Sequence, residues 1–145
     1  MKLLFLTNNL PFSVIIRGVT SCEWSHTAVA FDDVVIESRF GGVSTTTLDA
    51  FKARGKHSIV NVPLKDEESA RDFALSQVEK PYDFGGIFGF WFNRNIQDDT
   101  KWYCSELCAE VAKRGGVELV RSGLNGISPR DLWVLPNDVH QPESS

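Results

Sequence analysis

Apolar and β-branched residues dominate two consecutive stretches, Trp24–Phe31 and Val34–Arg39, and only the pair Asp32-Asp33 stands between them. Two such runs joined by two turn-forming residues predict a β-hairpin. A two-residue loop places Phe31 opposite Val34, and this register decides which residues share a face because side chains alternate along a strand. The hairpin is the clearest local prediction in the chain.

In this register, one face of the hairpin carries His26, Ala28, Ala30 and Glu37. Glu37 is a diagonal neighbour of His26 and lies within reach of its ring. A slip of one residue would separate the two side chains. The small Ala28 and Ala30 leave a shallow surface, on which we expect a helix to lie closely.

A second pattern predicts a helix that begins at or beside Cys104, and a pair of glycines ends it. The apolar residues at helical spacing are Leu107, Cys108, Val111 and Ala112. A thiol at a helix N-terminus meets unpaired N–H groups and the positive end of the helix dipole, and both favour the thiolate. A buried cysteine that merely packs is the alternative, since free cysteines are among the most buried residues.

The remaining patterns predict an α+β fold in which an antiparallel sheet packs against the cysteine helix. We expect one domain over residues 1–136 and a frayed tail over residues 137–145. Asp66 is expected to cap a helix that Lys80-Pro81 ends, and Pro129 to begin a short helix that reaches Trp133. The expected strands are Lys2–Leu6, His57–Leu64, Val117–Val120 and, as a short strand or an approach loop, Ser13–Arg17.

Charge and composition exclude several classes of function. The net charge is −4 and no basic run is present, which argues against nucleic acid as the main partner. No apolar run approaches a membrane span, and the apolar stretch Leu3–Leu6 is too short for a signal-peptide core. Three cysteines are an odd number for a disulfide framework. We therefore expect a cytoplasmic protein without a cofactor.

The candidate chemistry is a thiol, a base and an orienting carboxylate. Of the three histidines, only His26 shares a strand face with a carboxylate, since His57 begins a strand and His140 lies in the tail. Cys104, His26 and Glu37 thus form a set that is typical of thiol hydrolases. A core histidine bonded to Glu37 beside an unreactive cysteine explains the pattern equally well.

Two short motifs resemble a known family. The Trp-Ser-His-Thr-Ala-Val strand that contains His26, followed far downstream by Tyr-Cys-Ser-Glu-Leu around Cys104, is similar to the circularly permuted NlpC-type papain-like hydrolases. The nearest branch is the YiiX-like group, which is related to the lecithin:retinol acyltransferase group. The resemblance covers most of residues 20–135. It implies that Cys104 is the nucleophile, His26 the general base and acid, and Glu37 the third polar residue.

The resemblance also implies a supporting role for Tyr82, which matches a tyrosine near the nucleophile and would steady the oxyanion beside the Cys104 backbone N–H. The substrate stays open among cell-wall peptides, lipid or other acyl groups and isopeptide-linked proteins. The aromatic stretch Phe88–Phe92 favours an acyl or lipid substrate with peripheral lipid contact, or else simply belongs to the core.

Two alternatives have different chemistry. A binding or inhibitor module on the same fold would carry the same three residues without using them. A zinc site built from Cys104, Cys108 and His26 would lack a fourth ligand, and its Cys-x3-Cys spacing is poor for zinc.

Overall fold

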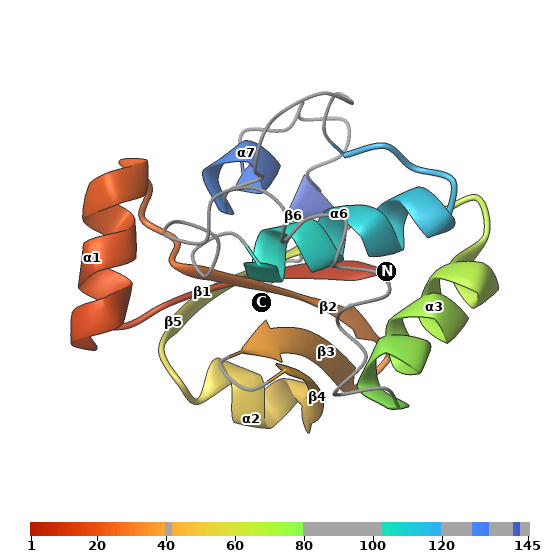
Figure 1. Cartoon of the computed structure of the whole chain (residues 1–145), viewed down its shortest axis with the longest axis horizontal. Coiled ribbons are helices and arrows are strands. Elements are labelled where there is room, and N and C mark those ends of the chain that lie inside the picture. Colours follow the sequence, from red (N-terminus) through yellow and green to blue (C-terminus); the bar gives the residue numbers. More distant parts are fainter. Residues whose placement is uncertain (40–41, 80–102, 120–128, 134–140, 143–145) are drawn as a thin grey trace.

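A computed structural model describes residues 1–39, 42–79, 103–119, 129–133 and 141–142 of the chain. Its centre is an antiparallel sheet in the order β4-β3-β2-β1-β5-β6 (Figure 1). The strands are β1 (Lys2–Thr7), β2 (His26–Phe31), β3 (Val34–Arg39), β4 (Gly42–Thr47), β5 (Lys56–Asn61) and β6 (Gln141–Pro142). The predicted α+β class with an antiparallel sheet is therefore confirmed.

The predicted hairpin forms, with Phe31 opposite Val34 and Val29 opposite Ile36. Asp32 in its loop has a φ of 54°, a left-handed conformation that aspartate tolerates better than most residues. Among the described residues the β2–β3 ladder ends at Val29–Ile36. Beyond that point β2 stays paired with β1 as far as His26, while β3 stays paired with β4 as far as Arg39. The sheet is thus divided at this end of the hairpin.

The described helices are α1 (Pro11–Thr20), α2 (Leu48–Lys52), α3 (Glu67–Glu79), α6 (Tyr103–Arg114) and α7 (Pro129–Trp133). Asp66 caps α3 as predicted, because its Oδ1 accepts a hydrogen bond of 3.0 Å from the Ser69 backbone N–H. Thr47 caps α2 in the same way, with its hydroxyl oxygen 3.2 Å from the Ala50 nitrogen. The cysteine helix forms as predicted and ends before Gly116, whose φ is +83°.

The sheet has an apolar core on each face. On one face α3, α6 and α7 pack against β-strand residues that include Val29 and Ile36. On the other face α2 packs against a second cluster that contains Ala28, Ala30 and Phe51. Figure 1 shows α6 and α2 on opposite sides of the sheet. The expectation that the cysteine helix lies on Ala28 and Ala30 is therefore wrong, because the short helix α2 covers those small residues instead.

Three further expectations differ from the structure. Residues Ser13–Arg17, expected to be a strand or a loop, belong to helix α1, which begins with proline at its first position. The described residues Val117–Leu119 form no strand, and Val117 instead donates its N–H to the Ala112 carbonyl, 3.0 Å away, as the chain leaves α6. Within the tail that was expected to fray, Gln141–Pro142 pairs with β5.

None of the helices in the described part of the chain has the length and apolar character needed to cross a membrane.

Candidate active site

Cys104 lies in the first turn of α6, where the expected helix N-terminus is found. The helix is fixed against the sheet by Leu107 and Val111, which are buried in the larger core. Cys104 itself is 7% exposed. Because the first N–H groups of a helix have no partner within it, the thiol sits where the backbone favours negative charge.

His26 and Glu37 are in direct contact. His26 Nε2 lies 2.7 Å from Glu37 Oε2, and the Glu37 side chain is only 1% exposed. An ionised carboxylate is an acceptor only, so Nε2 carries the proton of this hydrogen bond and Nδ1 is left for another partner. The contact expected from the hairpin register is therefore present, although the ladder itself ends before these residues.

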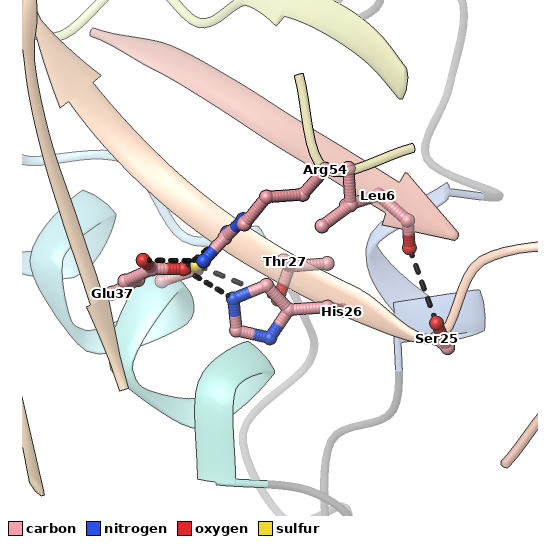
Figure 2. A network of polar contacts seen from close by, with 7 residues as sticks. Leu6, Ser25, His26, Thr27, Glu37 and Arg54 are labelled. Atoms are coloured by element: carbon pink, nitrogen blue, oxygen red, sulfur yellow. Dashed lines mark hydrogen bonds and ion pairs between the residues drawn. The ribbon is translucent and has the colours of Figure 1, made fainter. Parts of the chain in front are cut away.

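Arg54 completes the surroundings of the carboxylate. Its Nη1–H group donates to Glu37 Oε1 over 2.9 Å, and its Nη2–H group donates to Glu37 Oε2 over 2.7 Å. Figure 2 shows the guanidinium of Arg54 and the ring of His26 meeting at the Glu37 carboxylate. The two hydrogen bonds form a bidentate ion pair, the strongest arrangement available to these groups.

The divided end of the hairpin explains how the site assembles. His26 alternates with Ala28 and Ala30 and so belongs to the α2 face of the sheet, whereas Cys104 belongs to the α6 face. The two groups nevertheless lie close enough to interact, since Cys104 raises the pKa of His26 against the effect of burial. We infer that this contact is possible because the β2–β3 ladder ends before it reaches His26 and Glu37. If the ladder continued, hydrogen-bonded backbone would separate the two faces of the sheet at this point.

The electrostatics favour an ion pair between the thiol and the imidazole. Burial lowers the pKa of His26, but its hydrogen bonds and charge interactions with Cys104 and Glu37 prevail and raise that pKa to about 9. Burial raises the pKa of Cys104, but hydrogen bonding and charge from His26 prevail and lower it, with help from Thr27. The two shifts act in the same sense and favour thiolate and imidazolium over the neutral pair.

Glu37 stays ionised although it is buried. Burial raises its pKa, but hydrogen bonds and charge from His26 and Arg54 lower it to about 2. The charges of neighbouring groups therefore alternate in sign, in the order Cys104 thiolate, His26 imidazolium, Glu37 carboxylate and Arg54 guanidinium. Charges removed from water are tolerated when each has an opposite neighbour and hydrogen bonds.

Thr27 links the two cysteines of α6. Cys108 Sγ lies 3.6 Å from the Thr27 hydroxyl oxygen, in a contact where the thiol is the donor. Burial and the neighbouring Cys104 charge raise the pKa of Cys108, which therefore keeps its proton. The backbone and the hydroxyl of Thr27 in turn help to lower the pKa of Cys104 against the effect of its burial. Only one of the two nearby thiols is thus set to be a thiolate.

The sequence did not reveal the parts played by Arg54 and Thr27. Arg54 lies in a turn and carries no local signal, and Thr27 was assigned to the face of the hairpin away from the catalytic set. Tyr82 and the stretch Phe88–Phe92 lie outside the described residues. His57 is an exposed residue whose ring nitrogen Nδ1 is 3.2 Å from the Gly55 carbonyl oxygen.

Residues 3–122 match the family of permuted papain-like amidases of the YaeF/YiiX type, peptidase family C92. This match covers most of the chain, and the chain belongs to that family of cysteine hydrolases. The wider relation to NlpC-type enzymes and lecithin:retinol acyltransferases stays a prediction. No curated protein sequence matches the chain.

The crystal structure of the metalloprotein yiiX from Escherichia coli O157:H7 has a similar fold. It aligns with a TM-score of 0.69 over 99% of this chain and 95% of that chain, at 18% sequence identity. At this identity the likeness establishes the shared fold alone.

The description of yiiX as a metalloprotein raises the question of whether this site fits a metal. Within the described ranges, no group of three or more His, Cys, Asp and Glu side chains is placed to hold a metal ion. The Cys108 thiol is directed at the Thr27 hydroxyl, 3.6 Å away. The zinc site of Cys104, Cys108 and His26 that the sequence left open therefore gains no support.

Proposed function

We propose that the protein hydrolyses an amide or ester bond through an acyl-enzyme on Cys104, with His26 as base and acid and Glu37 as the residue that orients it. The observation that carries this proposal is the buried hydrogen bond between His26 and Glu37, 2.7 Å long, beside a thiol at a helix N-terminus. The amidase family to which the chain belongs supports an amide as the natural scissile group.

In the first step, the Cys104 thiolate attacks the carbonyl carbon and an S–C bond forms. The oxyanion is stabilised by the Cys104 backbone N–H, which has no partner within the helix. The His26 imidazolium then donates its Nδ1 proton to the leaving nitrogen or oxygen, the bond to the leaving group breaks, and a thioester remains.

In the second step, neutral His26 accepts a proton from water while the water oxygen attacks the thioester carbonyl. The S–C bond breaks, the acid product leaves and the thiolate–imidazolium pair is restored. Glu37 keeps the ring oriented throughout and stabilises the imidazolium. Tyr82 remains a proposed second donor to the oxyanion, and the cytoplasmic location stays a prediction.

The first test is selective labelling. Iodoacetamide near neutral pH should alkylate Cys104 much faster than Cys22 or Cys108, because His26 lowers the pKa of Cys104 while burial raises that of Cys108. Mass spectrometry of partly labelled protein measures the three rates. Equal labelling, or labelling mainly at the partly exposed Cys22, would contradict the assignment of Cys104 as nucleophile.

The second test is turnover. Cleavage should be measured on a panel of peptidoglycan fragments, acyl lipids and ubiquitin-like conjugates. Cys104→Ala should abolish it and His26→Ala should lower it about 10²- to 10⁴-fold, the usual contribution of general acid–base catalysis. Glu37→Gln should cause a smaller loss. Cys22→Ala is the matched control and should keep full activity.

Labelling and turnover together separate the proposal from its alternative. A catalytically inert module on the same fold would label at Cys104 but form no thioester with any member of the panel. Trapped thioester on Cys104, seen as an added acyl mass, would exclude that alternative.

A further inference from the structure

Arg54 lies beside the site, and the proposed reaction gives it no role. It follows α2 in the turn before β5, and its side chain is 25% exposed. Both of its hydrogen bonds to Glu37 come from the terminal nitrogens, and among the described residues its buried Nε has no hydrogen-bond partner. The polar contacts of this guanidinium are thus directed at one carboxylate.

Glu37 Oε2 has two partners at the same distance. It lies 2.7 Å from Arg54 Nη2 and 2.7 Å from His26 Nε2. A carboxylate free to turn about its terminal bond would move this oxygen out of line with the ring. The second hydrogen bond, from Nη1 to Oε1, prevents that rotation because a planar fork holds both oxygens at once.

We propose that Arg54 is a positioning residue for the reaction: it holds the Glu37 carboxylate so that Oε2 remains at His26 Nε2 and the ring presents Nδ1 to Cys104. This inference rests on the proposed function, because it concerns the efficiency of the same catalytic set. It assigns to the turn after α2, on the opposite face of the sheet from the nucleophile, a part in catalysis.

The packing beneath the network supports this role. The guanidinium carbon of Arg54 lies 4.8 Å from the centre of the Phe51 ring, and the His26 ring centre lies 6.2 Å from it. Phe51 is fully buried in the core of the α2 face. Arg54 and His26 therefore lie against the same rigid side chain, which limits how far either can move relative to the carboxylate.

An arginine fits this task better than a lysine. A single ammonium would neutralise Glu37 but would not fix both oxygens, whereas the fork supplies charge and orientation together. Arg54→Lys therefore separates the two contributions, and Arg54→Met removes both while keeping an unbranched side chain against Phe51. Arg71→Met is the matched control, because Arg71 also pairs with a carboxylate, Asp32, and lies over a ring, Phe31, away from the site.

The experiment measures acylation of Cys104 by p-nitrophenyl acetate, followed as the release of p-nitrophenolate when the thioester forms. Arg54→Met and Arg54→Lys should both acylate about tenfold or more slowly than the parent protein, the usual size of an effect on an orienting partner. The acid limb of the pH profile should move to higher pH in Arg54→Met but not in Arg54→Lys, since only the methionine removes the positive charge that keeps Glu37 ionised. Arg71→Met should match the parent.

Chemical rescue distinguishes positioning from support of the fold. Millimolar guanidinium chloride should restore part of the acylation rate of Arg54→Met by occupying the vacated space beside Glu37. It should not help Arg54→Met combined with Glu37→Gln. A folded Arg54→Met protein with the parent's rate and pH profile would overturn the proposal, and so would a slow variant that guanidinium does not rescue.

A spectroscopic measurement keeps the inference separate from the proposed function. The proton on His26 Nε2 should give a downfield NMR signal in the parent protein and Arg71→Met, because it is held in a buried hydrogen bond to Glu37. In Arg54→Met this signal should shift or broaden. If Cys104 proves unreactive in every variant, the proposed function fails, while an unchanged Nε2 signal in Arg54→Met would overturn the role of Arg54 by itself.

Discussion

At the scale of single residues, the site depends on the two nitrogens of one ring. Glu37 holds Nε2, so the proposed reaction uses the proton on Nδ1, the ring nitrogen that this hydrogen bond leaves available. The same carboxylate that orients the ring also stabilises its charged form. A buried histidine with only the thiol as partner would have neither a fixed ring orientation nor a stabilised imidazolium. The thiol and the imidazole would then be uncharged in a larger fraction of the molecules.

These shifts predict a particular pH dependence. Cys104 should become reactive to iodoacetamide well below the ordinary thiol pKa of 9.0, because His26 lowers its pKa. Turnover of an amide substrate should rise over the same acid limb and then fall as the pH passes about 9, where His26 loses the proton needed by the leaving group. Alkylation needs no such proton and should persist there. A common fall of both rates near pH 9 would contradict the role of His26 as acid.

Thr27 gives a second prediction at this scale. Its hydroxyl accepts from the Cys108 thiol, which leaves the hydroxyl hydrogen free to point at Cys104. Thr27→Val keeps the shape but removes this donor, so the pKa of Cys104 should rise and its alkylation at pH 6 should slow about tenfold or more, since a hydrogen bond to a charged group contributes about 1.5–3 kcal/mol. Thr7→Val is the control, because the buried Thr7 hydroxyl has no hydrogen-bond partner among the described residues. Equal rates in the two variants would remove Thr27 from the site.

At the scale of elements, the strongest sequence patterns were the ones that the structure confirmed. The hairpin register followed from a two-residue loop, and the helix that begins beside Cys104 followed from apolar spacing and the glycines after it. Both are local patterns, in which neighbours in sequence are neighbours in space. The contact between His26 and Glu37 could be expected for the same reason, since one hairpin carries both residues.

The elements that the sequence did not predict depend on distant contacts. Val14 and Ile15 are β-branched and favour a strand, yet they lie exposed on helix α1, while the polar Ser13 is buried with its hydroxyl 2.5 Å from that of Ser25. The face of the sheet that α6 covers was predicted wrongly, because both faces of the hairpin are apolar and the small Ala28 and Ala30 are covered by α2 instead. Arg54 was missed since no short-range pattern connects a turn after α2 to the middle of β3.

At the scale of the whole molecule, the site joins two cores that the sheet otherwise keeps apart. Cys104 comes from the α6 face, while His26, Glu37 and Arg54 share the α2 face. We therefore expect the ionised groups to stabilise the way the two layers fit together, in addition to their part in the proposed reaction. A change in the charge of Glu37 should consequently be seen in the free energy of unfolding of the entire protein.

The direction of that effect follows from the shifts in pKa. The pKa of Glu37 is about 2 in the fold, below its ordinary 4.5, so its contribution to stability is present above pH 4.5 and is lost as the pH falls toward 2. The pKa of His26 is about 9, above its ordinary 6.5, so its contribution is complete below pH 6.5 and is lost as the pH rises through 9. The contributions of Glu37 and His26 are therefore both complete between about pH 4.5 and 6.5, and the lowered pKa of Cys104 adds stability as the pH rises toward 9.

Urea unfolding at a series of pH values tests this expectation. Between pH 4.5 and 2, the free energy of unfolding of the parent protein should fall by on the order of 3 kcal/mol more than that of the double variant, Glu37→Gln with Arg54→Met. This size follows because one pKa unit corresponds to about 1.4 kcal/mol. The double variant is the right reference because it removes both partners of the ion pair and leaves no buried charge unpaired. Asp66, whose pKa is lowered by hydrogen bonds from Ser69, contributes equally to both proteins and cancels in the difference. If the free energy of unfolding falls equally in the two proteins over this pH range, the ionised network does not stabilise the packing of the two layers.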